Sequence, residues 1–342
     1  MARPRIIVTA ILLFVLCFSL YGFFGRGRPS QQALQALIEY GSPYSIPGVK
    51  SSHNHEDAVK SATFNTNEKA LISRKPRYAI TSSVQTASFT AMALMLGYSI
   101  QKHNDLKAMD AELVLLIRED EEDGVTAENR TRLEKAGWKI RVAEELTFDG
   151  VDNSAIRSHH RHNLNKLHLW TWTEYERILF IDADVVCHGS LEELWQMPGD
   201  FAAAPDVWWD VITDNKFNSG VIVFRPSVET FHDMIVKVSD PAYHQPNDAD
   251  QAFLNAYYRF RYFGLPYKYN FNLIMYQYHR AEWDMLWEEA VLIHFTVRKP
   301  RSNPVDHCHE GCNEWEVIEW YGQYFREMRA HYGWDNELPD YQ

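Results

Sequence analysis

Two aspartates separated by one residue, Asp182 and Asp184, are the residues of this chain best suited to chemistry. They follow 177–181, where four apolar side chains in a row are typical of a short buried strand. Alternate side chains of an extended chain share a face, so both carboxylates can turn toward one point beyond the strand. Crowded carboxylates repel each other unless a cation lies between them, and Mg²⁺ and Mn²⁺ prefer oxygen ligands. The pair therefore predicts a metal site at the carboxyl end of a strand, where open α/β sheets bind nucleotides.

A second pair with the same spacing, Asp248 and Asp250, does not give this prediction. An Asp-x-Asp sequence can also be a solvated turn, and only the first pair follows an apolar strand. Acidic residues favour the amino terminus of a helix for electrostatic reasons, and the run from Asn247 is predicted to open a helix that reaches Tyr258. Asp248 and Asp250 therefore have a structural explanation, whereas Gln251 has no such ready explanation.

Other residues with possible chemical roles lie on both sides of the acidic pair. Lys166 lies on a predicted helix that leads into the acidic strand. His294 lies in a late predicted strand followed by Arg298 and Lys299, so an imidazole and two cations could serve a metal and its diphosphate, although a lone histidine in that setting is more often structural. The segment 218–220 ends in a glycine that would allow close backbone approach to a ligand, or it is an ordinary turn before a strand.

The composition narrows the class of protein. Of 342 residues, 46% are hydrophobic and 14% aromatic, enough for a packed core in one large domain or two small ones. The formal net charge of −12 argues against a general nucleic-acid surface, and an acidic protein that binds a phosphate substrate needs a cation to mediate. Of four cysteines, Cys308 and Cys312 favour a local disulfide over zinc binding, because no second cysteine pair completes four ligands nearby.

Strands and helices are predicted to alternate through the globular part of the chain. Strands are expected over 78–82, 111–117, 138–142, 177–181, 200–204, 221–224 and 290–295, and helices over 89–100, 127–136, 226–238, 247–258 and 314–332. This alternation indicates the α/β class, with a mostly parallel sheet that helices cover on both faces.

The amino terminus carries a run, 6–24, that is almost wholly apolar. A membrane-spanning helix needs about 20 such residues. A cleaved signal peptide is the competing interpretation, but Phe23-Phe24-Gly25-Arg26 is a poor cleavage site. We expect a cytoplasmic tail and transmembrane helix over 1–28, a stem over 29–75 and a lumenal domain over 76–342. Within that domain, Asn129 begins a glycosylation sequon whose use the sequence leaves open.

Taken together, these segments resemble glycosyltransferase family 8, and the resemblance covers about 77–300. Its motifs are 165–170, 181–184, 204–206, 218–221, 250–251, 294–295 and 299–300. The resemblance implies a GT-A fold with a Rossmann-like sheet, a Mn²⁺ (or Mg²⁺) cofactor, a UDP-sugar donor and a retaining transfer of hexose. With the anchor, it indicates a single-pass type II enzyme of the Golgi (or ER) membrane that acts on a glycan or glycoconjugate acceptor.

The resemblance also implies a role for each matching residue. The metal ligands would be Asp182, Asp184 and His294. The uridine would lie at Thr81, Ser82 and the neighbouring chain. The rest of the donor site would comprise Lys299 at the diphosphate, Arg157 and Lys166 at the phosphate and sugar, and the motif residues Ala183, Asn218, Ser219 and Gly220. The catalytic residues around the transferred sugar would be Asp206, Asp250 and Gln251. Retention could use a transient contact with Asp250 or Gln251, or attack by the acceptor on the same face.

The chain departs from the family pattern after His294. Four residues separate it from Lys299, fewer than the family usually has, so Arg298 could be the phosphate contact instead. This short segment motivates a second hypothesis, a catalytically silent, membrane-tethered protein that binds a nucleotide sugar or glycan. A nucleotidyltransferase is a third hypothesis, which is disfavoured because no glycine-rich phosphate loop follows the first predicted strand.

Overall fold

The computed structural model describes residues 75–119, 124–148, 162–208, 216–244, 249–300, 313–335 and 338. All of them belong to one of the two units into which the chain divides, Leu71–Gln342. Within these described residues no helix has the length and apolar character needed to cross a bilayer. The anchor predicted over 1–28, and the stem as far as residue 74, lie outside them.

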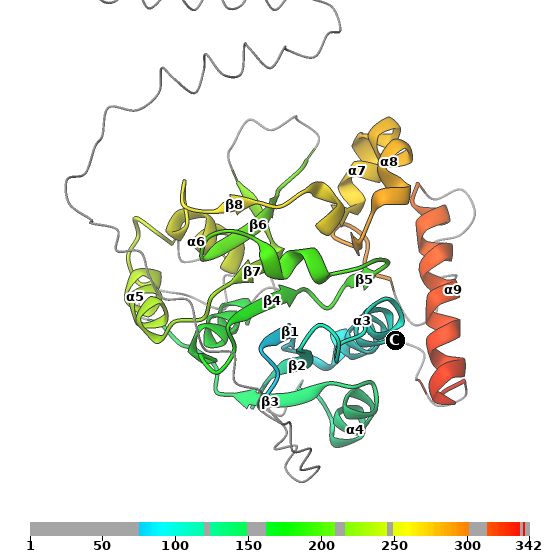
Figure 1. The fold of residues 1–342 in the computed structure, drawn as a ribbon, viewed down its shortest axis with the longest axis horizontal. Coiled ribbons are helices and arrows are strands. Elements are labelled where there is room, and N and C mark those ends of the chain that lie inside the picture. Colours follow the sequence, from blue (N-terminus) through cyan, green and yellow to red (C-terminus); the bar gives the residue numbers. More distant parts are fainter. Residues whose placement is uncertain are drawn as a thin grey trace, which may run out of the picture. The chain divides into compact units, whose positions relative to one another are not determined.

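A seven-stranded sheet forms the centre of the described unit (Figure 1). The strand order is β3 (Lys139–Ala143), β2 (Ala111–Arg118), β1 (Tyr78–Val84), β4 (Arg177–Ile181), β7 (Phe217–Phe224), β6 (Phe201–Pro205) and β8 (Phe263–Gly264). The first four strands run parallel, β7 runs antiparallel to both neighbours, and β8 is parallel to β6. The prediction of a mostly parallel sheet is therefore confirmed.

Helices cover both faces of this sheet, which explains why all five residues of β4 are buried. Leu179 and Ile181 pack into a core with α3 (Thr90–His103), α4 (Ala127–Lys135) and α9 (Trp315–Tyr332). Ile178 and Phe180 point to the opposite face and pack with the 3₁₀ helix η3 (Asn163–Thr171), α5 (Val228–Val238) and α6 (Asp250–Tyr257). With both faces covered, the ends of the strands remain as the place for a ligand.

A smaller sheet of three strands extends the polypeptide beyond the end of β4. Its order is β5 (Val185–Cys187), β10 (Leu292–His294) and β9 (Phe271–Asn272), with β10 antiparallel to β5 and parallel to β9. His294 pairs with Val185, and the backbone N–H of Phe295 donates to the carbonyl of Asp184 at 3.0 Å. This small sheet brings a late strand of the sequence beside the acidic pair.

Several helix ends follow from local sequence. The Ser227 hydroxyl accepts a hydrogen bond from the Thr230 N–H at 3.1 Å and caps α5. Gly333, with φ of 74°, ends α9 in the left-handed conformation that glycine adopts without strain. The other helical elements are α7 (Leu273–Tyr278), α8 (Arg280–Leu286) and the 3₁₀ helices η1 (Ala87–Phe89), η4 (Glu192–Gln196), η5 (Tyr267–Tyr269) and η6 (Trp287–Glu289).

The structure differs from the expected elements in three respects. The strand expected over 221–224 begins at Phe217, so the segment 218–220 is part of β7 and not a turn before it. The helix that carries Lys166 is a 3₁₀ helix. The elements β5, β8, β9, α7 and α8 were not predicted. The strands have only two or three residues, and the helices six and seven, so neither kind is long enough to show a clear period in the sequence.

Candidate active site

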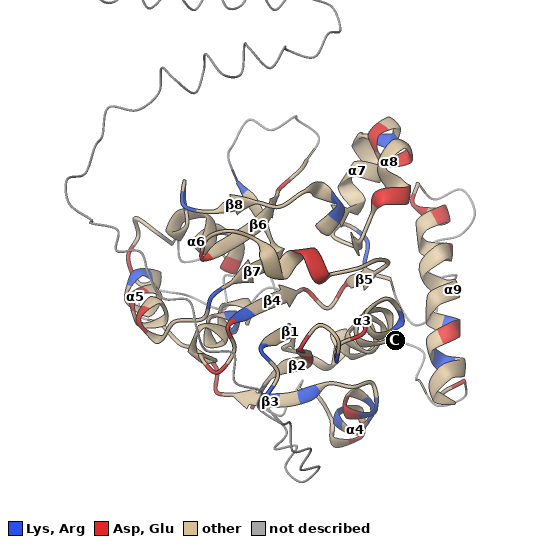
Figure 2. Cartoon of the chain, in the orientation of Figure 1, with Lys and Arg blue, Asp and Glu red and all other residues tan. Residues whose placement is uncertain are grey.

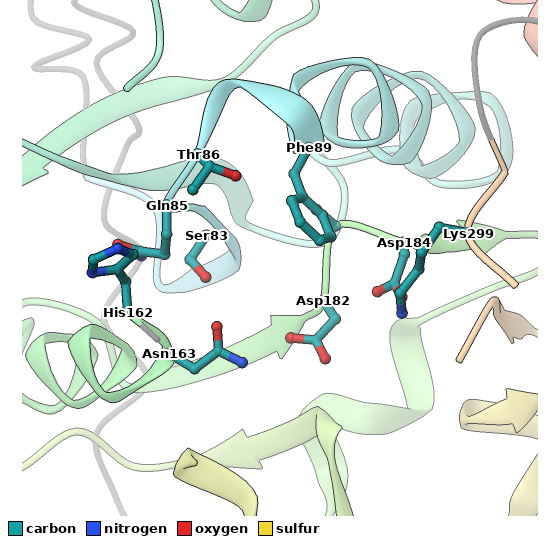
Figure 3. A pocket seen from close by; sticks show the side chains of 10 residues that line it. Ser83, Gln85, Thr86, Phe89, His162, Asn163, Asp182, Asp184 and Lys299 are labelled. Atoms are coloured by element: carbon teal, nitrogen blue, oxygen red, sulfur yellow. The ribbon is translucent and has the colours of Figure 1, made fainter. Parts of the chain in front are cut away.

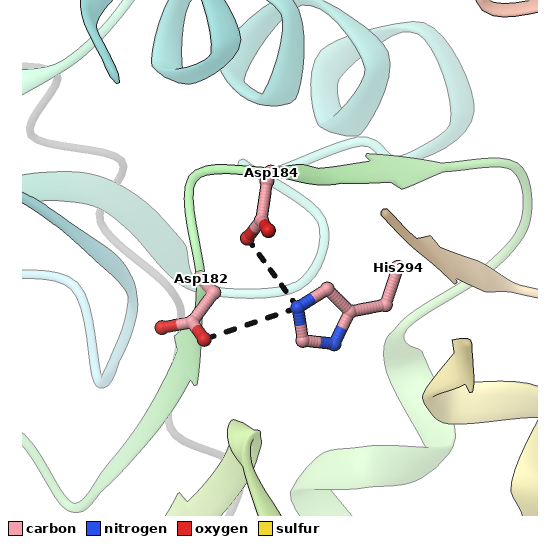
Figure 4. A group of neighbouring side chains, drawn as sticks. All are labelled: Asp182, Asp184 and His294. Atoms are coloured by element: carbon pink, nitrogen blue, oxygen red, sulfur yellow. Dashed lines mark ion pairs between the residues drawn. The ribbon is translucent and has the colours of Figure 1, made fainter. Parts of the chain in front are cut away.

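Asp182, Asp184 and His294 converge beyond the end of β4 (Figure 4). Asp182 follows β4 directly, Asp184 precedes β5, and His294 is the last residue of β10. The Nε2 atom of His294 lies 3.3 Å from an Asp184 carboxylate oxygen and 3.9 Å from one of Asp182. One ligand atom from each residue lies within 4.8 Å of the others. The structure thus brings together the three residues predicted to hold a metal.

The chemistry of these three groups suits a hard divalent cation. Two carboxylate oxygens and one imidazole nitrogen face each other across separations that a single small ion can bridge. Asp184 and His294 are almost fully buried, so neither side chain can turn away from the other into solvent. In Figure 2 acidic residues mark the segment between β4 and β5 that carries the pair.

Gly220 lies against the group of ligands. A Cβ atom at this position would lie 2.3 Å from Cε1 of His294 and 2.8 Å from Oδ2 of Asp182. Its carbonyl also accepts from the Asp182 N–H at 2.7 Å. The glycine predicted to allow close approach of a ligand therefore makes room for the two metal-site side chains.

Two lysines balance the acidic charges. Lys166 is 2% exposed; its Nζ lies 2.6 Å from Oδ2 of Asp250, 3.5 Å from Oδ1 of Asp182 and 3.1 Å from the Ser219 carbonyl. Burial would lower the pKa of Lys166, but Asp182 and Asp250 outweigh it and raise that pKa. The side chain of Lys166 therefore stays positively charged between the metal-site and sugar-side carboxylates.

The second lysine, Lys299, donates to Oδ2 of Asp184 and to the Phe295 carbonyl. Burial would raise the pKa of Asp184, but Lys299 and His294 outweigh it and hold that pKa well below its usual range. For Asp182 burial and the neighbouring Asp184 charge outweigh Lys166 and raise the pKa, although 33% of its side chain reaches solvent. The pKa values of Asp182 and Asp184 are thus shifted in opposite directions.

A cleft of about 580 Å³, open to solvent, runs alongside the acidic pair. Figure 3 shows Lys299 beside Asp184 at one end and His162 with Gln85 at the other. Its lining comprises Ser83, Gln85, Thr86, Phe89, His162, Asn163, Asp182, Ala183, Asp184 and Lys299. Most of these lining side chains are polar or charged, as the binding of a polar ligand requires.

A hydrogen-bonded network continues from the metal group to the residues predicted around a sugar. The Asn218 amide donates to Oδ1 of Asp206 at 3.2 Å, and Gln251 donates to Oδ2 of Asp206 at 3.0 Å. Gln251 in turn accepts from the Ser219 N–H at 3.1 Å, and the Ser219 hydroxyl donates to Asp250 at 3.0 Å. All five residues therefore belong to one cluster at the ends of β6, β7 and α6.

The comparison with family models decides the identity of this arrangement. The model described as Glycosyl transferase family 8 matches residues 80–300, a span that includes the acidic pair, the cluster around Asp206 and His294. The chain belongs to glycosyltransferase family 8. Within the described residues, the fold and the converging groups agree with this assignment.

Family 8 proteins with curated functions match over part of their length. Glycogenin-2 of Homo sapiens is 29% identical over 226 residues, which cover 65% of this chain and 40% of that protein. UDP-glucuronate:xylan alpha-glucuronosyltransferase 2 of Arabidopsis thaliana is 29% identical over 168 residues, which cover 49% of this chain and 25% of that protein. The chain therefore spans less than half the length of both relatives.

A solved structure supports the fold. The apo form of the glycosyltransferase GlyE of Streptococcus pneumoniae TIGR4 superposes with a TM-score of 0.50 at 17% identity, covering 75% of this chain and 64% of that chain. Together with the strand order, this likeness gives the family 8 chain a GT-A-like α/β fold with a mostly parallel central sheet.

The predicted donor residues of this family 8 chain are not all at the cleft. Thr81 and Ser82 are fully buried in β1, because that strand extends two residues further than predicted. The cleft is lined instead by residues that follow them, Ser83, Gln85 and Thr86. Gln85 and Thr86 follow the carboxyl end of this parallel strand directly, a position that could have identified them, whereas Ser83 lies within the strand.

Lys299 lines the cleft, whereas the Arg298 guanidinium bonds to the Glu314 carboxylate at 2.9 Å. This geometry favours Lys299 over Arg298 for a phosphate. Arg157, Asn247 and the Cys308–Cys312 pair lie outside the described residues. Sequence reasoning also missed Asn270, which bonds His294 and lies in an apolar stretch without any recognisable motif.

Proposed function

We propose that this chain is a metal-dependent hexosyltransferase, which moves a sugar from a UDP-sugar to a glycan or glycoconjugate with retention of anomeric configuration. The observation that carries the proposal is the convergence of Asp182, Asp184 and His294 beside a cleft that also contains Lys299. Membership of family 8 supports a sugar transfer, and the relatives' names support a nucleotide-sugar donor. The donor sugar and the acceptor are set by pocket contacts that differ within one fold.

Charge development defines what the residues must do. Breaking the bond between a sugar and a diphosphate builds negative charge on the leaving phosphate and positive charge on the sugar. Mn²⁺ or Mg²⁺ held by Asp182, Asp184 and His294 would supply Lewis-acid neutralisation of the leaving group. Lys299 adds a second positive charge at the same end of the cleft.

The sugar side of the site is acidic and amide-rich. Asp206, Asn218 and Gln251 hold one another by hydrogen bonds, and they would orient the sugar and stabilise its developing positive charge. Asp250 is 2% exposed, and its Oδ2 already accepts from Lys166 and Ser219. This burial favours an electrostatic role for Asp250 over nucleophilic attack on the sugar.

We place this activity at the Golgi (or ER) membrane, with the described domain in the lumen. The support is the apolar run 6–24 and its short arginine-bearing flank. Protease treatment of intact microsomes should then leave the domain undigested until detergent is added. Digestion of the domain in intact vesicles would contradict the lumenal orientation. Recovery of the protein in the soluble fraction would contradict the membrane anchor.

A donor screen tests the activity. The full-length protein, purified in detergent, is incubated with a panel of UDP-sugars, and UDP release is measured with and without Mn²⁺. We expect Mn²⁺-dependent hydrolysis of at least one donor, and we expect Asp184→Asn to abolish it because the variant loses a ligand charge.

The matched control is Asp200→Asn. Asp200 is exposed and precedes β6, at the opposite end of this strand from Asp206, so this variant should keep the activity. Binding of a UDP-sugar by calorimetry without any turnover would instead support a silent binding protein. Full activity of Asp184→Asn would show that the proposed metal site is not needed for sugar transfer.

A further inference from the structure

Asn270 joins the metal group to the sugar-side cluster. It is fully buried and precedes β9, and its side-chain amide lies between two functional residues. The His294 Nδ1 atom lies 2.8 Å from Oδ1 of Asn270, and the Asn270 Nδ2 group donates to Oδ1 of Asn218 at 3.0 Å. The amide thus contacts a metal-site residue on one side and a sugar-side residue on the other.

The orientation of Asn218 is fixed from two sides. The backbone N–H of Gly220 can only donate, and it points at Oδ1 of Asn218 at 2.9 Å. A carboxylate of Asp206 can only accept, and it receives the Asn218 Nδ2 group at 3.2 Å. If the side-chain amide of Asn218 were rotated by 180°, its Nδ2 group would face the Gly220 N–H and its Oδ1 would face the Asp206 carboxylate. Neither contact could be a hydrogen bond, so the orientation of Asn218 is fixed.

The fixed Asn218 determines the next two residues. Its Oδ1 only accepts, so Asn270 must present Nδ2 to it and must turn its own Oδ1 toward His294. An oxygen acceptor facing Nδ1 requires that His294 carries its proton there. In the neutral ring the lone pair is then on Nε2, and this atom faces Asp184 and Asp182 (Figure 4).

We propose that Asn270 is a positioning residue, which holds His294 in the Nδ1-protonated form that can ligate a metal and ties this ligand to Asn218 and Asp206. The inference rests on the proposed function, because it assumes that the three-residue group binds a divalent cation. Partners of this kind typically change metal affinity by about 10- to 100-fold when they are removed.

Binding of Mn²⁺ alone tests the proposal without any need for turnover. The full-length protein in detergent is titrated with Mn²⁺, and free Mn²⁺ is measured by electron paramagnetic resonance. Asn270→Leu removes both hydrogen bonds and should weaken Mn²⁺ binding by about 10- to 100-fold. Asn270→Asp keeps an acceptor for His294 and should recover most of the affinity, yet not donor hydrolysis, because two acceptors then face each other at Asn218.

Asn272→Ala is the matched control. Asn272 is equally buried, two residues along the chain, and its side chain accepts from the Ile274 N–H at 3.0 Å, capping α7. This variant should lose stability and keep Mn²⁺ affinity. A wild-type protein that binds no Mn²⁺ would overturn the metal site of the proposed function. Wild-type affinity in Asn270→Leu would overturn only the inference about Asn270.

A second measurement applies if Asn270→Leu does not fold. In protein labelled with ¹⁵N-histidine and free of metal, the chemical shifts of the His294 ring nitrogens report which one is protonated. Loss of one signal set in His294→Gln assigns the residue among the 15 histidines. We expect protonated Nδ1, and protonation of Nε2 in the neutral ring would overturn the proposal.

Discussion

The backbone of Gly220 passes so close to the metal-site side chains that a side chain of its own has no room. We predict that Gly220→Ala lowers UDP release by about 100-fold, since displacement of catalytic groups by about 1 Å has effects of this size. The added Cβ would lie 2.3 Å from Cε1 of His294, and that ring has little freedom to move because it is buried and hydrogen-bonded to Asn270. The rate is measured at saturating Mn²⁺ with the donor identified by the screen.

Gly264→Ala provides the comparison for Gly220. Gly264 also lies in a strand of the large sheet, but no atom lies within 4 Å of a Cβ built there. The activity of Gly264→Ala should match that of the wild type. Equal activity of both alanine variants would mean that His294 and Asp182 do not need their present positions.

Lys166 and Asp250 form a buried ion pair, with side chains that are 2% and 3% exposed. Removing one partner of such a pair leaves an uncompensated charge and costs about 3–5 kcal/mol. We predict a loss of this size in the free energy of unfolding of Lys166→Met, measured by urea denaturation. The double variant Lys166→Met, Asp250→Asn should recover part of it, because only Asp182, whose side chain is 33% exposed, then lacks the lysine charge. An unchanged loss would contradict the ion-pair explanation.

Among elements, the small sheet of β5, β10 and β9 has the largest effect on the site, although its strands have only two or three residues. Asn104, at the end of α3, forms hydrogen bonds with the backbone of the loop after β5. Its side chain accepts from the Leu191 N–H at 2.8 Å and donates to the carbonyls of Ile100 and Gly189, each at 3.1 Å. The side chain of Asn104 therefore links α3 to the loop after β5, in addition to the hydrogen bond from the Cys187 N–H of β5 to the Ser99 hydroxyl of α3 at 3.0 Å.

We predict that Asn104→Ala lowers the free energy of unfolding by about 2 kcal/mol, because buried backbone groups lose their partners. The pairing of β5 with β10 remains, so Mn²⁺ affinity should stay unchanged. Urea denaturation and Mn²⁺ titration check the two halves of this prediction. Asn129→Ala is the control, because the Asn129 carbonyl accepts only from Arg132 on the same helix, at 3.2 Å; an equal loss there would contradict the role of Asn104.

The large sheet could be predicted from the sequence because its strands are long enough to show a pattern. The run 178–181 is wholly apolar and buried on both faces, as a parallel central strand should be. The small sheet could not be predicted, since 271–272 and 185–187 are too short to show any period. The segment 218–220 looked like a turn because its residues are turn formers, but the sheet contacts of β7 override that local preference.

At the scale of the whole molecule, the candidate site is assembled from segments far apart in the chain. The acidic pair was recognisable from its own strand. For His294 the sequence left both a metal-ligand role and a structural role open, and only the resemblance to family 8 favoured the ligand. Asn270 had no signal at all, since its role depends on distances that only the fold sets. The spacing of residues along the sequence can therefore predict ligands that share one strand, but it does not predict which residues of other strands will contact them.

Two histidines, His103 at the end of α3 and His188 directly after β5, both contact α9. The Tyr324 hydroxyl on α9 lies 3.0 Å from Nε2 of His103 and 2.9 Å from Nδ1 of His188. Burial lowers the pKa of both histidines, and the neighbouring Lys102 charge lowers it further. In the unfolded chain both would titrate near the ordinary value of about 6.5.

The sign of the effect on stability follows from proton binding. Below about pH 6.5 the unfolded chain binds protons that the folded chain takes up only at lower pH, so stability falls as the solution is acidified. We predict that the double variant His103→Gln, His188→Gln loses less stability than the wild type between about pH 7.5 and about pH 5.5. Urea denaturation at both pH values measures the difference, and His232→Gln on the exposed surface of α5 serves as the control. An identical pH dependence in the wild type and the double variant would show that this histidine pair does not carry the acid sensitivity of the fold.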